Sequence, residues 1–420
     1  MQGHPDDRPA WAQRIRQERV TRRWSQAEAV RALRVHFPSE QIGDAGLLLD
    51  WKRWESGRTE PDATYKPLLA KTFGTVTGAL FPTARDGCGP LDQAKAADTE
   101  DLLERMRAPH LDDDTVEALT VTVDELCTRY ATAPAVALLP QARTWLGRLT
   151  DALNRRLTLD QHRDILQLAG FLALLIGCLE NDLGLTTSAE TSRRAALSVG
   201  QESNSADLTG WAHELRAWYA LTQGDYRTVI AAAAAGQATS AGRPVAAQLW
   251  AQAAKAWARI GERRQVEVAL DQARSVLEAL APAEHLGNHF VVDPSRFDLW
   301  AMDCYRLVGE DRLAAGYARE VLRNGIDTAG RETSPMRNSA AQLTLGVVAA
   351  RNSELEAAVY HGTRALRGER TSLPSLLMAS RELRQVLDHR FAAAPETAAY
   401  AHEVRFLENK LLHWSTSADG

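Results

Sequence analysis

The sequence has few cysteines, and those it has are far apart. Cys88, Cys127, Cys178 and Cys304 form no Cys-x-x-Cys pair among the 420 residues. Neither a zinc site nor a disulfide framework is therefore expected, and the expected compartment is a reducing cytoplasm. No apolar run approaches the roughly 18 residues of a membrane span. Residues 1–8 are polar and acidic, unlike a secretion signal, so we expect no membrane partner.

Sequence motifs of enzymes are also missing. The chain has no phosphate-binding glycine loop, nucleophile elbow or paired-carboxylate motif. His285, His289 and Asp293 are residue types that bind metals, but Gly287 and the β-rich Phe290-Val291-Val292 argue against the helical turn that would bring them together. We expect no enzyme, no metal and no cofactor, and a structured loop at this place.

Charge is distributed unevenly along the chain. Residues 1–82 hold 13 Lys+Arg and 10 Asp+Glu, which gives +3, whereas the remainder holds 36 and 44, which gives -8. A small basic module on an acidic body is suited to binding a polyanion through the module alone. The length predicts two or more domains.

Residues 9–82 are predicted to form a small domain of five short helices. Ser25 is an expected N-cap, with Glu28 as its capping-box partner. A turn near Gly43-Asp44 precedes a helix over 47–55, and Gly57 is its expected C-cap. The apolar residues expected in the core are Val30, Leu33, Trp51, Trp54, Leu68 and Phe73.

The rest of the chain divides into a linker and a long helical region. Residues 83–100 carry helix breakers and no periodicity, which predicts a linker. Residues 101–415 are predicted to be helical almost throughout. Turn residues recur there at intervals of 40, 37, 48 and 43 residues, which indicates an α-solenoid of helix pairs. These turn positions are Gly184, Gly224, Gly261, Gly309 and Asn352.

Three segments near the N-terminus carry a family resemblance. They are Ile15-Arg16-Gln17-Glu18-Arg19, Trp24-Ser25-Gln26-Ala27-Glu28 and Trp51-Lys52-Arg53-Trp54-Glu55-Ser56-Gly57-Arg58-Thr59-Glu60-Pro61. Over residues 10–82 the chain resembles the Cro/repressor-like helix-turn-helix family, also called the xenobiotic-response-element family. The third helix of that family typically ends in Arg-Trp-Glu-x-Gly-x-x-x-Pro. The resemblance implies binding to double-stranded DNA.

Physical chemistry assigns roles to residues of these segments. Unpaired amides at a helix N-terminus bind phosphate, and Gln26 there adds a side-chain donor. Arg53 is suited to bidentate pairing with guanine, and Lys52 and Arg58 to phosphate contacts. The alternative for Lys52 and Arg53 is a solvated helix face. The expected DNA-contacting residues are Ser25, Gln26, Asp50, Lys52, Arg53 and Arg58.

A second resemblance lies in the helical region. Trp250, Ala254 and Trp257 place a large, a small and an aromatic residue on one helix face, and Trp211 and Trp218 repeat the spacing. Over about residues 160–390 this resembles the tetratricopeptide repeat. The concave face of a solenoid is its natural ligand site, although tryptophans at this spacing also suit the repeat core. The candidate ligand-binding residues are Trp211, Trp218, Trp250, Trp257, Asn338 and Gln342.

The two resemblances together imply a function. A helix-turn-helix domain joined to tetratricopeptide-like repeats resembles bacterial regulators that sense small peptides. We expect a cytoplasmic transcriptional regulator, a repressor, that binds a palindromic operator as a homodimer and is nucleoid-associated when on DNA. Its effector would be a peptide, a small molecule or a protein. The alternative is a protein-interaction adaptor whose helix-turn-helix is vestigial.

Overall fold

The protein is all-α, as the sequence predicts. The computed structural model describes residues 8–37, 44–82, 112–281, 285–368 and 370–418. Within these ranges the chain forms nineteen helices and no β-strand. Its β-type pairing there is an isolated bridge between Ile326 and Glu332. The linker predicted at 83–100 lies outside the described residues.

Five short helices form the N-terminal bundle. The second begins at Gln26, directly after its predicted N-cap Ser25. The third begins at Asp44, three residues before the predicted Leu47, and Gly43 of the predicted turn lies outside the described residues. The helices are α1 (Ala10–Thr21), α2 (Gln26–Arg34), α3 (Asp44–Glu55), α4 (Tyr65–Phe73) and α5 (Thr77–Leu80).

Local hydrogen bonds fix where α2 begins and α3 ends. The Glu28 N–H donates to Ser25 Oγ at 3.2 Å, and the Ser25 N–H donates to Glu28 Oε2 at 2.6 Å, so the predicted capping box is confirmed. Gly57 has φ +74°, and the Arg58 N–H donates to the Arg53 carbonyl at 3.0 Å. This is the glycine C-cap that the sequence predicts.

The apolar core of the N-terminal bundle also agrees with the prediction. Trp51 is fully buried, and its ring meets the edge of Phe73 at a centroid distance of 5.9 Å. Trp54 lies 4.9 Å from the ring of Tyr65. Val30 and Leu33 are buried beside them, and Leu68 packs against this core from its rim. The helical spacing of these apolar residues therefore correctly indicated which face of each helix is buried in the core.

Fourteen longer helices follow within the described residues. The five predicted turns at Gly184, Gly224, Gly261, Gly309 and Asn352-Ser353-Glu354 each lie between two helices, with a positive φ at the glycine in the first four and at Ser353 in the fifth. The helices are α7 (Asp113–Arg129), α8 (Ala135–Leu153), α9 (Leu159–Asp182), α10 (Thr186–Glu202), α11 (Ala206–Gln223), α12 (Tyr226–Thr239), α13 (Val245–Ile260), α14 (Arg263–Glu278), α15 (Arg296–Leu307), α16 (Asp311–Asn324), α17 (Pro335–Arg351), α18 (Leu355–Leu366), α19 (Leu373–Arg390) and α20 (Pro395–Ala418).

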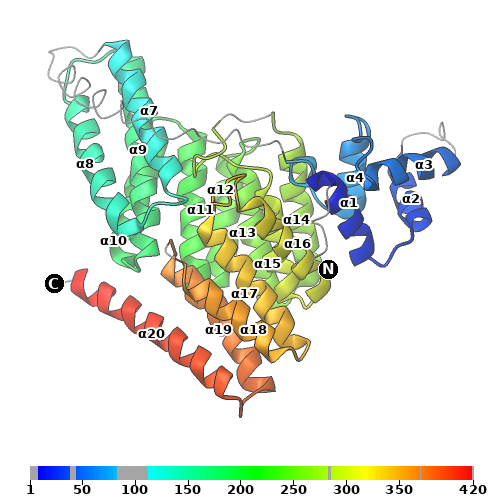
Figure 1. Ribbon diagram of the computed structural model, residues 1–420. Helices are drawn as coiled ribbons and strands as arrows, with labels where there is room; N and C mark the ends of the chain where they lie inside the picture. The colour runs from blue at the N-terminus through cyan, green and yellow to red at the C-terminus, as the bar shows by residue number, and fades with distance from the viewer. Residues whose placement is uncertain (1–7, 38–43, 83–111, 282–284, 369, 419–420) are drawn as a thin grey trace.

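These helices stack side by side along a curve (Figure 1). From α9 to α19 each odd-numbered helix packs on the next odd-numbered one, and the even-numbered helices α10, α12, α14 and α16 pack mainly on their two neighbours in the chain. The odd-numbered helices therefore lie on the inner side of the curve. The curve closes on itself, because α19 also packs against α9 and α11.

The connection between α14 and α15 occupies part of this inner side. Phe290 is buried and lies 5.3 Å from the Trp211 ring and 5.6 Å from the Phe171 ring. The His289 N–H donates to the Cys127 carbonyl at 3.3 Å. The curved helices thus surround the connection between α14 and α15 at the place where the sequence analysis expected a concave ligand site.

His289 should make the stability of the protein depend on pH. Burial, with help from the charges of Arg296, Arg337 and Arg370, holds the pKa of His289 well below its ordinary value. The unfolded chain therefore takes up a proton below pH ~6.5 that the folded protein does not. We expect this residue alone to lower the free energy of unfolding by up to about 1.4 kcal/mol per pH unit as the pH falls below that value.

Urea unfolding at pH 7.0 and 5.0 measures this effect. His289→Gln should show a smaller loss of stability between the two pH values than the unchanged protein. The same substitution at the exposed His402 is the matched control and should leave the loss unaltered. Equal losses in His289→Gln and the unchanged protein would contradict the assignment.

The N-terminal bundle docks on the body through α1 and α5. The buried Arg14 guanidinium on α1 donates to Asp298 Oδ2 at 2.5 Å and to Oδ1 at 2.9 Å, and its Nη1 also donates to the Ala79 carbonyl at 2.7 Å. Thr75 Oγ1 donates to the same Asp298 carboxylate at 3.3 Å, and Arg14 Nε lies 3.8 Å from Glu320. A charged cluster therefore joins the bundle to α15 and α16.

One helix among the described residues has the length and apolar composition of a membrane span. It is α9, and 72% of its most apolar 18-residue window is buried inside the protein. Burial of this kind is typical of a core helix, which passes the same test of length and composition.

Candidate functional site

The outer face of α3 is the first candidate site. In Figure 1, α2 and α3 lie on the side of the N-terminal bundle that faces away from the stacked helices, while α1 lies nearer to them. Helix α3 buries Leu47, Trp51 and Trp54 and leaves Lys52 and Arg53 exposed. A basic helix face is therefore held clear of the body.

Four of the expected DNA-contacting residues lie on or beside this face. Lys52, Arg53 and Arg58 are exposed. Arg53 Nη1 lies 3.3 Å from Asp50 Oδ1 in an ion pair that is itself exposed. Exposed pairs of this kind contribute about 0–1 kcal/mol, so Asp50 orients the Arg53 guanidinium but does not hold it away from a competing anion.

The other two expected residues, Ser25 and Gln26, have roles within the bundle. The Ser25 hydroxyl accepts the capping hydrogen bond of α2. Gln26 Nε2 donates to Glu55 Oε2 at 2.8 Å, so its amide ties α2 to α3. The backbone amides at this helix start remain an arrangement suited to phosphate.

Glu55 is a structural residue that sequence reasoning did not single out. Its buried carboxylate accepts hydrogen bonds from Arg19, Gln26 and the indole Nε1 of Trp51. Burial alone would raise the pKa of Glu55, but these hydrogen bonds outweigh it and lower the pKa below its ordinary value. The sequence signals at this residue were its spacing of four from Trp51 and its place in the Arg-Trp-Glu-x-Gly pattern.

The four candidate tryptophans lie on α11 and α13. Trp211 is buried against Phe290, and Trp218 Nε1 donates to Ser375 Oγ at 3.0 Å. Trp250 and Trp257 are half-buried and pack against the main apolar core. Their surroundings are those of packed side chains, and the ring of Trp211 already has a partner from the chain itself.

Asn338 and Gln342 lie apart from the tryptophans, on α17. Both are buried. Asn338 Nδ2 donates to the Gly325 carbonyl at 3.3 Å, and Gln342 Oε1 lies 2.6 Å from His361 Nδ1. The structure therefore places the six candidate ligand residues in two separate groups, each engaged with neighbouring protein groups.

The three possible metal ligands do not converge. His285 is exposed and lies 3.8 Å from Asp124, whereas His289 is partly buried, with its Nε2 3.7 Å from Cys178 Sγ. Asp293 accepts a hydrogen bond from the Ser295 hydroxyl. Within the described residues, no group of three or more His, Cys, Asp or Glu side chains could hold a metal ion.

Comparison of the chain with protein-family models and with curated proteins finds no match.

Proposed function

We propose that this protein is a sequence-specific DNA-binding transcriptional regulator, with its N-terminal bundle acting as a helix-turn-helix of the Cro/repressor-like type. The observation that carries the proposal is the placement of α3, which lies on the side of the bundle away from the stacked helices (Figure 1) and carries the exposed Lys52 and Arg53, while α1 and α5 anchor the bundle. A recognition helix needs this free approach to the major groove.

Each candidate residue has a defined part in this proposal. The Arg53 guanidinium pairs with a guanine edge, while Lys52 and Arg58 contact phosphates and set the register of the protein on DNA. Ser25 caps α2, whose first amides approach a phosphate. Gln26 holds α2 against α3 through Glu55.

The remaining parts of the proposal concern assembly and control. The regulator acts in the bacterial cytoplasm as a repressor and binds a palindromic operator as a homodimer, because one small helical module covers little DNA. The stacked helices form a tetratricopeptide-like solenoid that senses a peptide, a small molecule or a partner. Ligand binding shifts the population of dimer geometries and so the spacing of the two recognition helices.

Selection of bound fragments from genomic DNA with the full-length protein tests the proposal. We expect one enriched palindromic sequence whose affinity falls as salt rises. Arg53→Ala should cost about 1–3 kcal/mol of binding and relax specificity at one position. Lys52→Ala should weaken binding to all sequences and reduce the salt dependence. Arg163→Ala, at an exposed position of α9, is the control and should leave binding unchanged.

The alternative is a protein-interaction adaptor with a vestigial helix-turn-helix. Leu49 favours it, because this apolar side chain on the outer face of α3 is 50% exposed. In that case no DNA sequence is enriched, and the double variant Lys52→Ala/Arg53→Ala keeps its binding to protein partners. Enrichment of an operator would exclude the adaptor as the main function.

A further inference from the structure

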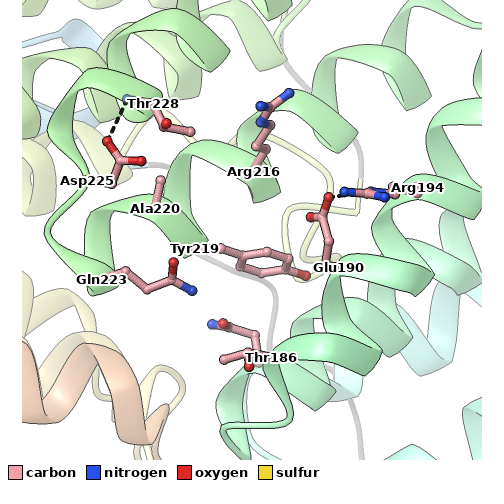
Figure 2. Close-up of a pocket in the computed structure, with 10 residues that line it drawn as sticks. Thr186, Glu190, Arg194, Arg216, Tyr219, Ala220, Gln223, Asp225 and Thr228 are labelled. Atoms are coloured by element: carbon pink, nitrogen blue, oxygen red, sulfur yellow. Dashed lines mark hydrogen bonds and ion pairs between the residues drawn. The ribbon is translucent and has the colours of Figure 1, made fainter.

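A polar cavity opens between α10, α11 and the start of α12. Its volume is about 250 Å³, and Figure 2 shows Tyr219 reaching into it from α11 toward Glu190 and Thr186 of α10. None of the six candidate ligand residues lines this cavity, although the rings of Tyr219 and Trp218 are 5.7 Å apart. The cavity is therefore separate from the concave site considered above.

Two buried hydrogen-bond donors line the cavity without partners. Asn181 is 2% exposed and Tyr219 is 6% exposed. Neither Asn181 Nδ2 nor the Tyr219 hydroxyl has a hydrogen-bond partner among the described residues. Burial raises the pKa of Tyr219 well above its ordinary value, so the hydroxyl keeps its proton. Unpaired buried donors are rare in proteins and call for an acceptor.

The charged side chains around these donors leave one cation unpaired. Arg216 is exposed and has neither a hydrogen bond nor an ion pair with any other described residue. The Glu190 carboxylate is ionised, with a pKa of about 2, but its oxygens already accept from Arg193 and Arg194. Asp225 accepts from the Thr228 N–H at the start of α12.

The two buried donors thus lack acceptors, while Glu190 already pairs with two arginines and Asp225 accepts from Thr228 and feels the charge of Arg216. A ligand that satisfies this set must bring acceptor oxygens and one negative charge. A carboxylate does both, because its two oxygens accept several hydrogen bonds and pair with a guanidinium. The cavity volume corresponds to about eight water molecules, which is the size of a small organic acid.

We propose that this cavity binds a small organic acid through its carboxylate. Arg216 pairs with the negative charge, and Asn181 Nδ2 and the Tyr219 hydroxyl donate to the carboxylate oxygens. Gly177 makes this position of the hydroxyl possible, since a Cβ there would lie 2.9 Å from it. The inference names a chemical class for the effector of the proposed regulator, and it holds or fails independently of DNA binding.

Thermal unfolding of the full-length protein without DNA provides the test. The probes are benzoate, succinate and glutarate, each compared with its neutral amide, together with inorganic phosphate. We expect a saturable rise in Tm of about 2 °C or more with at least one acid, and none with its amide. Titration calorimetry then gives Kd for that acid.

Three variants locate the binding. Arg216→Gln should raise Kd at least tenfold, and Tyr219→Phe should raise it several-fold. Tyr219→Phe should leave the Tm of the free protein unchanged, because its hydroxyl has no hydrogen bond to lose. Arg319→Gln, an exposed arginine on α16, is the matched control and should leave Kd unchanged.

Four results would overturn the proposal. They are the absence of a saturable shift with all three acids, equal shifts with the amides, an unchanged Kd in Arg216→Gln, and binding of phosphate in place of the carboxylates. None of these results bears on operator binding, which is measured separately.

Discussion

Replacing Asp182 with alanine is expected to lower the free energy of unfolding by about 3–5 kcal/mol. Asp182 and Arg370 are both buried, and Arg370 Nη2 donates to Asp182 Oδ2 at 2.7 Å. The same guanidinium donates from Nε to the Tyr130 carbonyl at 3.0 Å and lies over the Tyr130 ring. Without Asp182 its positive charge stays buried with no counter-charge, and that is the source of the large loss.

Equilibrium urea unfolding measures this loss, and an exposed ion pair supplies the control. Asp207→Ala removes the partner of Arg243 at the surface and should cost less than about 1 kcal/mol. The double variant Asp182→Ala/Arg370→Met should recover much of the stability, because it buries no unpaired charge. A cost at Asp182 no larger than that at Asp207 would show that the pair does not hold the ends of the helix array together.

The second large effect is expected at Arg14. Replacing it with alanine leaves Asp298 and Glu320 buried at the junction without their shared cation, and the expected cost is again about 3–5 kcal/mol. The loss is local to the junction. Amide hydrogen exchange should therefore accelerate in α1, α5 and α15, while α17 and α19 keep their protection.

Arg16 offers a control on the same helix. It is exposed on α1, so Arg16→Ala should change neither the stability nor the exchange rates at the junction. Equal exchange in α15 for Arg14→Ala and Arg16→Ala would mean that the bundle is held on the body by its apolar contacts alone. The comparison therefore separates the charge cluster from the rest of the junction.

Features set by neighbouring residues were predictable from the sequence. The capping box at Ser25 and Glu28 and the C-cap at Gly57 depend on residues a few positions apart, and the same is true of the glycine turns between the long helices. Helical periodicity likewise revealed the shared face of Trp51 and Trp54. In these cases the backbone conformation follows from local chemistry, so single-sequence reasoning reaches it.

Contacts between distant parts of the chain were not predictable. Arg14 and Asp298 are 284 positions apart, and Asp182 and Arg370 are 188 apart. No local pattern says which buried arginine meets which carboxylate. The insertion of Phe290 beside Trp211 was equally hidden, because it depends on how the helices curve around the connection between α14 and α15.

The polar cavity at Tyr219 was missed for a related reason. Its lining comes from α10, α11 and α12 together with Asn181. The three proposed donors, Asn181, Arg216 and Tyr219, form no recognisable sequence motif. What marks the site is a lack of partners for Asn181 and Tyr219, which becomes visible only when their neighbours are known.

The return of α19 to α9 restricts how this protein can change in length. An open row of helix pairs can gain or lose a pair at either end, because each pair touches only its neighbours. Here α19 meets α9 and α11, and the Leu411 side chain of α20 packs on Gly184 at the turn after α9. Duplication or deletion of one pair would move these meeting surfaces out of register, so chains that share this closure should differ in their loops and not in their number of helix pairs.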